Sequence, residues 1–331
     1  MRERDVDLDA VAAVADQCEE AIARLYDGPE AWLHLPWASL DELVGGIGEG
    51  NVWFVGGFSG HGKTSFLVDL TRHLLGMERT VYYCGTETVP NELHTRLACQ
   101  RVGVYSGHVF TGKACQWANW SQEIRPALVK DIQAQKALGA GNRFLVFPAQ
   151  RINGARIRAA FQDAAKHGAD LVIIDHIDHI DHGGASSGFE DSRMLAHLVL
   201  DEAQRTRLRV IVATQFNNES LRGDRLGPYQ PPQPHYVYMG GHKRQVAWGM
   251  LGLFRPLRES VTADELKGAR AGRVKVKELL EPNALAVSVM KHRHYGLHEG
   301  DVVVLRFDHG RLSDIPERDR HSTTYEGVRR I

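Results

Sequence analysis

The chain has 331 residues, of which 43% are hydrophobic and 24% charged, with a formal net charge of −1. This composition excludes disorder throughout and suits one large α/β domain or two small ones. We expect no membrane span, because no run of about 18 apolar residues occurs. An acidic start without a signal-peptide core and four widely spaced cysteines predict a cytoplasmic protein with reduced thiols, without a disulfide framework or a zinc site.

Charge is divided unevenly along the chain. Residues 1–200 carry 18 Lys and Arg against 25 Asp and Glu, whereas residues 201–331 carry 22 against 16. A polyanionic partner would therefore contact the C-terminal part. A chance imbalance between solvated faces explains the same counts equally well.

In chain order, residues 6–26 come first, with one apolar stripe at helical spacing that needs a surface to cover it. From residue 50 onward, short β-branched runs alternate with amphipathic stretches. Such runs are typical of strands buried on both faces, so the alternation favours a parallel sheet between helices. The predicted strands are 52–57, 80–86, 143–147, 170–175 and 209–215, and the predicted helices are 63–77, 90–102, 118–138, 153–167 and 190–206.

The C-terminal part has a different texture. Residues 216–245 are rich in Gly and Pro and predict a long loop, and long loops in compact domains are usually functional. Residues 285–292 and 301–307 predict the two strands of a hairpin. Residues 256–283 are interpreted as an insertion before this hairpin.

Residues 57–64, GFSGHGKT, fit the phosphate-binding pattern GxxxxGK[ST] between a predicted strand and a predicted helix. Glycines let backbone N–H groups surround phosphate oxygens, and the helix N-terminus adds positive charge. Lys63 is expected to reach the β- and γ-phosphates and Thr64 to hold Mg²⁺, so ATP and Mg²⁺ are the predicted cofactors. The alternative is a Gly-rich turn with an incidental lysine. The predicted nucleotide contacts are Gly57, Ser59, Gly60, His61, Gly62, Lys63, Thr64 and Ser65.

Three polar residues at strand ends complete a hydrolytic site. Asp175 closes the run LVIID and suits a second Mg²⁺ ligand of the Walker B type. Glu87 follows the strand after the phosphate loop and is a candidate base for water, and Gln215 ends the run RVIVATQ and could contact the γ-phosphate. For each residue the alternative is an ordinary polar side chain at a strand end.

This ordered set resembles the motor domain of DnaB-like replicative helicases over roughly residues 33–315. The resemblance rests on GFSGHGKTS, GTET, LVIID, ATQFN and the Lys291-x-Arg293 motif before Tyr295-Gly296. It implies a RecA-like P-loop core with a mostly parallel sheet flanked by helices, a C-terminal β-hairpin and a short N-terminal helix. It also implies homo-hexameric rings on single-stranded DNA, movement 5′→3′ and ATP sites shared between subunits. Lys291 and Arg293 would then act on the neighbour's ATP.

The resemblance divides the chain into a linker helix at 1–32, which would pack on a neighbouring subunit, and a motor domain at 33–331. Only about 30 residues precede the motor, so we expect a short helicase of a phage, plasmid or other mobile element, working with loader or replication proteins.

The chain departs from the family at two places. His176 stands where the family usually has Tyr, within the stretch DHIDHIDH (175–182). We interpret this stretch as a strand end that enters a surface loop. The alternative is a second metal site on His176, His179 and His182. In the loop after Gln215, the family's usual stretch is replaced by a glycine pair and a basic cluster. The predicted nucleic-acid contacts are Arg222, Arg225, Gly240, Gly241, His242, Lys243 and Arg244.

Two functions therefore remain in view. The first is an ATP-driven helicase or translocase on single-stranded DNA, and the departures leave open whether RNA takes its place. The second is a RecA- or KaiC-like assembly ATPase that binds DNA or a protein without separating strands. A lid without any role in nucleic-acid binding is the alternative for the 216–245 loop.

Overall fold

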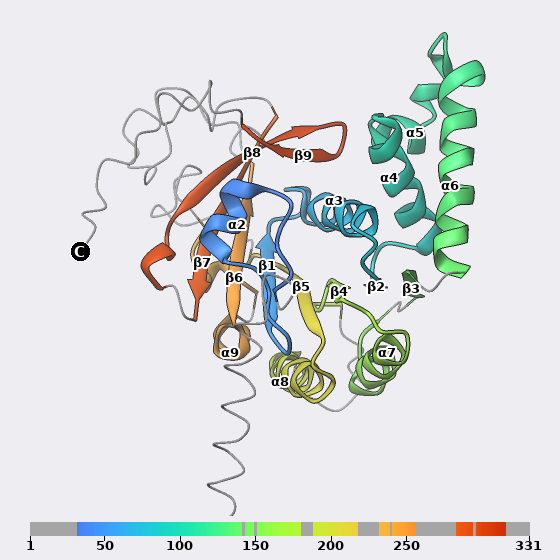
Figure 1. The fold of residues 1–331 in the computed structure, drawn as a ribbon. Helices are drawn as coiled ribbons and strands as arrows, with labels where there is room; N and C mark the ends of the chain where they lie inside the picture. Colours follow the sequence, from blue (N-terminus) through green and yellow to red (C-terminus); the bar gives the residue numbers. More distant parts are fainter. Residues whose placement is uncertain are drawn as a thin grey trace, which may run out of the picture.

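The computed structural model describes most of the chain (Figure 1). The described residues are 32–140, 143–148, 151–179, 188–217, 232–238, 240–255, 283–293 and 296–315. The predicted helix at 6–26, Arg222, Arg225, His182 and most of the 256–283 segment lie outside them.

Within the described residues, nine strands form one sheet in the order β3-β2-β4-β5-β1-β6-β7-β8-β9. The pairs from β3 to β6 are parallel, and those from β6 to β9 are antiparallel. The strands are β1 Val52–Gly57, β2 Val81–Gly85, β3 Phe144–Pro148, β4 Leu171–Asp175, β5 Arg209–Gln215, β6 Gly249–Phe254, β7 Ala284–His292, β8 Val302–Asp308 and β9 Arg311–Asp314.

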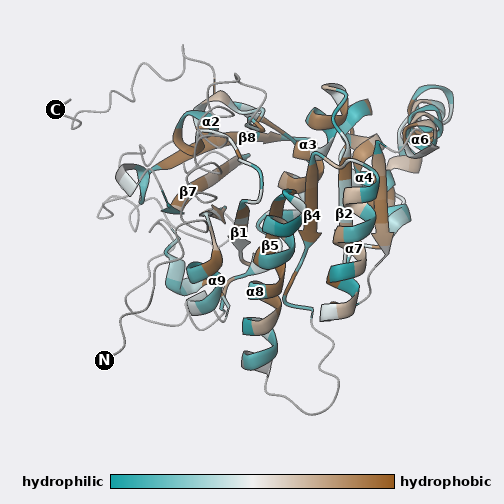
Figure 2. Ribbon diagram, turned by 60° about the horizontal axis from the view of Figure 1, so that its bottom comes forward, coloured by the Kyte–Doolittle hydropathy of each residue, from teal (hydrophilic) through white to brown (hydrophobic). Residues whose placement is uncertain are grey.

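Helices cover both faces of this sheet (Figures 1 and 2). Alternation along β1 shows how the two layers form, because Val52 and Phe54 pack with α7 and α8, whereas Trp53 and Val55 pack with α2, α3 and α4. None of the described helices is long and apolar enough to cross a membrane. The helices are α2 Ala38–Val44, α3 Lys63–Gly76, α4 Pro90–Val102, α5 Ser106–Phe110, α6 Arg125–Ala140, α7 Gly154–Lys166, α8 Gly188–Thr206 and α9 Gly240–Val246, with short turns η2 Lys113–Gln116, η3 Trp120–Ile124, η5 Pro234–Tyr236 and η7 Gly296–His298.

The predicted strands and helices are confirmed to within a few residues, and the predicted hairpin is the antiparallel pair β7–β8. Two predictions are corrected. Residues 240–246 form α9, so 216–245 is not one continuous loop, and the segment expected as a helix from 118 begins with the π-helical turn η3.

Strand β6 was missed because its sequence, GMLGLF, carries two glycines, which are weak strand formers. The structure explains both of them. A Cβ on Gly249 would lie 2.3 Å from the Trp53 ring, and one on Gly252 would lie 2.5 Å from Pro232. β6 therefore lies against bulky neighbours that leave no room for side chains at these positions.

Candidate nucleotide site

The phosphate loop joins β1 to α3, as its sequence predicts. Gly60 and Gly62 have φ values of 77° and 97°, in the left-handed region that glycine adopts without strain. Helix α3 begins at Lys63, directly after Gly62. The N–H groups of a helix's first turn have no partner within the helix, so this loop and helix end present donors suited to phosphate oxygens.

Lys63 lies inside this loop. Its Nζ donates hydrogen bonds to the carbonyl oxygens of Gly57 (2.7 Å) and Phe58 (3.0 Å), and the residue is only 8% exposed. Burial lowers the pKa of Lys63, and the nearby carboxylates of Asp175, Asp178 and Glu87 oppose that shift. A buried ammonium group with carboxylates nearby suits an anionic ligand that binds together with a metal cation.

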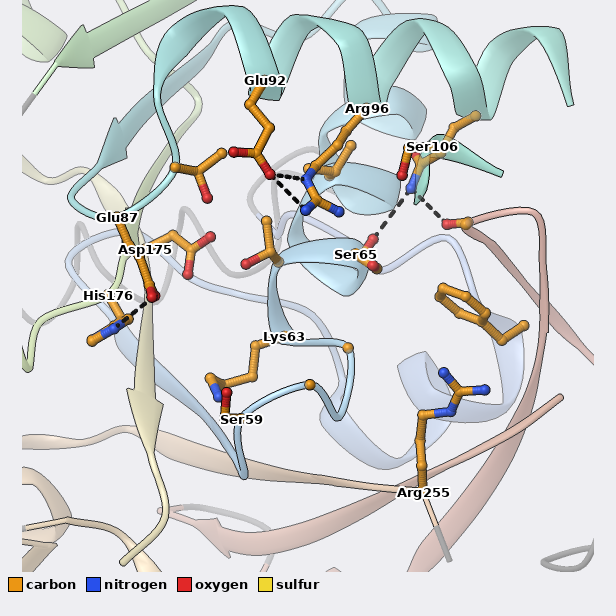
Figure 3. Close-up of a pocket in the computed structure, with 18 of the residues that line it drawn as sticks. Ser59, Lys63, Ser65, Glu87, Glu92, Arg96, Ser106, Asp175, His176 and Arg255 are labelled. Atoms are coloured by element: carbon orange, nitrogen blue, oxygen red, sulfur yellow. Dashed lines mark hydrogen bonds and ion pairs between the residues drawn. The ribbon is translucent and has the colours of Figure 1, made fainter. Parts of the chain in front are cut away.

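A cavity of about 440 Å³ opens beside Lys63, a size ordinary for small-molecule sites (Figure 3). It lies at the ends of β4 and β5 and at the start of α3. Most of the residues predicted for nucleotide binding, metal binding and catalysis meet here. The cavity is lined by Ser59, Gly60, Gly62, Lys63, Thr64, Ser65, Glu87, Asp175 and Gln215 from the predicted set, together with Val68, Thr88, Glu92, Arg96, Gln100, Tyr105, Ser106, His176, Arg255, Phe307 and Gly310.

Asp175 and Thr64 place a carboxylate and a hydroxyl in the cavity, two groups that could each provide one oxygen ligand to Mg²⁺. Asp175 is 3% exposed, and the Tyr83 hydroxyl donates to its Oδ2 over 2.8 Å. Burial and the neighbouring carboxylate raise the pKa of Tyr83, which keeps this donor protonated. A carboxylate and a hydroxyl in one phosphate-binding cavity fit the preference of Mg²⁺ for oxygen ligands and substrate phosphates.

Glu87 and Gln215 approach the same side chain, that of His176. The Nε2 atom of His176 lies 3.2 Å from Glu87 Oε2 and 3.1 Å from the Gln215 amide nitrogen. The sequence indicated Glu87 and Gln215 but missed His176 as a site residue, because the repeated histidines suggested a surface loop or a metal site. Its place directly after Asp175 at a strand end is the signal that would have pointed to it.

The side chain of His61 does not line the cavity, so a contact of this residue with nucleotide would be made by its backbone. It is 2% exposed and packs against the rings of Phe58 and Phe254. Its Nδ1 accepts a hydrogen bond from the Arg255 backbone N–H over 3.1 Å. His61 therefore anchors the loop to the end of β6. Gly57 lies behind the loop, where its carbonyl holds Lys63.

The cavity also contains two arginines that the sequence did not single out. Arg96 on α4 pairs with Glu92 (2.6 Å) and lies over the Phe110 ring at 5.3 Å. Arg255 lies over the Phe307 ring at 5.1 Å. With Lys63 they place three cations on the wall of a cavity that also carries the carboxylates of Glu87, Glu92 and Asp175, which suits a triphosphate that binds together with Mg²⁺.

The predicted nucleic-acid residues on α9 do not share one environment. Arg244 and Gly241 are exposed, and Gly240 and His242 are half-buried. Lys243 is buried, pairs with Asp178 and donates to Thr214 Oγ1 (3.0 Å). Lys243 is thus a structural residue, and its prediction as a phosphate contact is corrected.

The Lys-x-Arg motif lies outside the cavity of its own subunit. Lys291 Nζ donates to the carbonyl oxygens of Arg244 and Ala247, near the end of α9, and burial lowers its pKa. Arg293 is exposed, with its guanidinium 5.6 Å from the Trp248 ring centre. Arg293 is therefore accessible to another subunit, whereas Lys291 is held by its own chain.

The sheet and the loop at this cavity define a P-loop fold of the RecA-like class. Residues 33–224, more than half of the chain, match the family model described as DnaB-like helicase C terminal domain. The chain belongs to this family, as its motifs predicted.

Solved structures agree on the fold. "The Structure Of A DnaB-Like Replicative Helicase And Its Interactions With Primase" matches with a TM-score of 0.70 and 15% identity, over 95% of this chain and 68% of that one. A second solved structure, described as an ATPase domain, matches with a TM-score of 0.67 and 16% identity, over 95% of this chain and 100% of that one. No curated protein sequence matches the chain significantly.

Proposed function

We propose that this protein is an ATP-dependent, ring-forming helicase or translocase that hydrolyses ATP between subunits and moves on single-stranded DNA, in the 5′→3′ direction. The observation that carries the proposal is the convergence of Lys63, Thr64, Glu87, Asp175 and Gln215 on one cavity, in a chain of the DnaB-like family. Phosphate binding, metal binding and activation of water all need this combination.

In this proposal each residue has one task. Lys63 turns from the loop carbonyls to the β- and γ-phosphates, and Glu87 accepts the proton of the attacking water. Gln215 contacts the γ-phosphate. Thr64 and Asp175 would hold Mg²⁺, which supplies charge neutralisation on the phosphates when bound.

The exposed position of Arg293 supports an ATP site shared between subunits. A guanidinium placed on the γ-phosphate stabilises charge that develops in the transition state. Because Arg293 does not line its own cavity, it would serve the cavity of a neighbour. Lys291 would support it by fixing the hairpin to α9.

DNA binding is assigned to α9 and to the preceding segment. The proposed contacts are Gly240, Gly241, His242 and Arg244, together with Arg222 and Arg225, which lie outside the described residues. Binding through phosphate contacts is independent of base sequence and weakens steeply with salt.

The test measures ATP hydrolysis with and without single-stranded DNA, unwinding of a forked duplex, and particle mass with an ATP analogue. We expect DNA-stimulated turnover, ATP-dependent unwinding and a hexamer, all of which require an intact cavity. Lys63→Ala should abolish turnover and unwinding while leaving the fold intact. Deletion of residues 1–28 should break up the ring, and an intact hexamer would contradict the proposed linker role.

The burial of Lys243 favours one alternative, because it removes a cation from the predicted DNA contacts. That alternative is a RecA- or KaiC-like assembly ATPase that binds DNA or a protein partner without unwinding. DNA-stimulated ATP hydrolysis without separation of the forked duplex would support it and refute the helicase.

A further inference from the structure

His176 lines the edge of the nucleotide site, and it is not among the site residues predicted from the sequence. Its side chain is 9% exposed, whereas that of Glu87 is 71% exposed. One ring nitrogen, Nε2, lies 3.2 Å from Glu87 Oε2 and 3.1 Å from the terminal amide of Gln215, whose oxygen faces the ring when Nε2–H is the donor. Figure 3 shows the bond between His176 and Glu87 at the edge of the cavity. The histidine therefore connects two residues that the proposed function places at the γ-phosphate.

The other ring nitrogen determines where the imidazole carries its proton. The backbone N–H of Asp178 points at His176 Nδ1 over 3.2 Å, so Nδ1 is an acceptor. In the neutral ring the proton is then on Nε2, which donates to the Glu87 carboxylate. The Asp178 carboxylate oxygen, 3.6 Å from Nδ1, lies beyond good hydrogen-bond distance.

Buried groups hold Asp178 in this position. Its Oδ2 accepts hydrogen bonds from the Gln215 backbone N–H (2.7 Å) and from Thr214 Oγ1 (2.9 Å). Its other oxygen pairs with Lys243, which is 1% exposed. The orientation of the His176 ring is thus set by a network that reaches from β4 and β5 to α9.

Thr86 brings the backbones of Glu87 and His176 together. Its Oγ1 accepts from the His176 backbone N–H (2.9 Å), and its own N–H donates to the Asp175 carbonyl (2.8 Å). These bonds join the ends of β2 and β4 but leave the long side chain of Glu87 free to rotate. Within the described residues, the hydrogen bond that orients the Glu87 carboxylate comes from His176.

Building on the ATPase function above, we propose that His176 is a positioning residue for hydrolysis. Its Nε2–H holds one oxygen of the Glu87 carboxylate, and the other oxygen is left to accept a proton from the attacking water. Fixing a mobile base in a productive orientation lowers the entropic cost of reaching the transition state. The effect belongs to turnover and not to nucleotide binding, because the bond orients the base and leaves the phosphate loop unchanged.

The first test compares His176→Leu, which removes the ring nitrogens, with His176→Gln, which retains an N–H near the position of Nε2. We expect His176→Leu to lower kcat by about 100-fold without a matching change in the Kd for ATP, and His176→Gln to restore part of the loss. His167→Leu, a half-buried histidine after α7 outside the cavity, is the control. Unchanged kcat, or a loss confined to KM, would overturn the proposal.

The second test asks whether His176 acts through Glu87. In a Glu87→Ala background, His176→Leu should cause no further loss of turnover. If the two residues acted independently, the fold-losses of the single variants would multiply. The same substitution should weaken binding of ADP with aluminium fluoride, a mimic of the transition state, and leave ADP binding unchanged. Multiplying losses, or equal effects on both complexes, would contradict the positioning role.

The two proposals fail in different ways. Wild-type turnover and its loss in Lys63→Ala are measured in the same assay. Absence of turnover in the wild-type protein would refute the ATPase. Turnover that is insensitive to His176 would refute only the positioning role.

Discussion

Polar side chains are arranged differently in the parallel and the antiparallel halves of the sheet. In the parallel half, Glu87, Asp175 and Gln215 follow or end neighbouring strands and meet in one cavity. In the antiparallel half and α9, basic residues that are adjacent in sequence diverge: Lys243 is buried beside exposed Arg244. Parallel strands gather their carboxyl ends at one edge, whereas helices and single strands send successive side chains in different directions.

The β7 end shows the same divergence within three residues. His292 is buried, donates from Nε2 to the Val44 carbonyl oxygen (2.8 Å) and packs against Trp53. Lys291 reaches the opposite side, where it contacts the end of α9. A basic run in the sequence is therefore a poor guide to the charge that is available to a partner.

The largest effect should follow removal of Arg293, the exposed residue beyond β7 that the proposed function assigns to the ATP site of a neighbouring subunit. Arg293→Ala should lower ATP turnover by about 10³-fold or more and leave nucleotide binding largely intact. Arg125→Ala, at an exposed arginine on α6, is the control. Mixing Arg293→Ala with Glu87→Gln subunits should restore part of the activity, because some interfaces then hold both intact residues. Normal turnover of Arg293→Ala would refute its role.

Glu87→Gln tests the parallel half. Loss of the proposed base should reduce kcat by about 10²- to 10³-fold without loss of ATP affinity, measured by steady-state kinetics and by binding of a fluorescent nucleotide. Glu123→Gln, at an exposed glutamate on η3, should have no effect. A decrease in affinity with unchanged kcat would show that Glu87 binds nucleotide and does not activate water.

Lys243→Met tests the buried member of the basic cluster. Because it leaves Asp178 buried without its partner, we expect the free energy of unfolding to fall by about 3–5 kcal/mol, measured by urea denaturation. The double variant with Asp178→Asn should regain part of this loss. Weaker DNA binding with unchanged stability would instead show that Lys243 contacts DNA.

The smallest effect is expected for Arg244→Ala, which removes an exposed charge. Affinity for single-stranded DNA should fall, and the slope of log K against log salt should become shallower by about 0.7 for each lost phosphate contact. Lys130→Ala removes an exposed charge from α6, far from α9 in Figure 1, and should change neither quantity. Equal effects of both variants would indicate non-specific attraction.

Local pattern in the chain was sufficient for the parallel core apart from β6, and for most of its cavity. The alternation of apolar runs with amphipathic stretches defined the parallel strands β1 to β5 and their helices, and GxxxxGK[ST] with Asp175 and Glu87 defined most of the cavity. These signals are short-range, because burial on both faces of a strand and the turn of a phosphate loop constrain residues that are neighbours in the chain.

Contacts between distant segments set the remaining features. His176 became a site residue because Thr86 joins β2 to β4, Lys243 became a core residue because Asp178 lies opposite it, and β6 formed despite two glycines because Trp53 and Pro232 lie against them. In each case a buried polar or bulky group needed a partner from a distant segment, and a linear pattern does not contain that pairing.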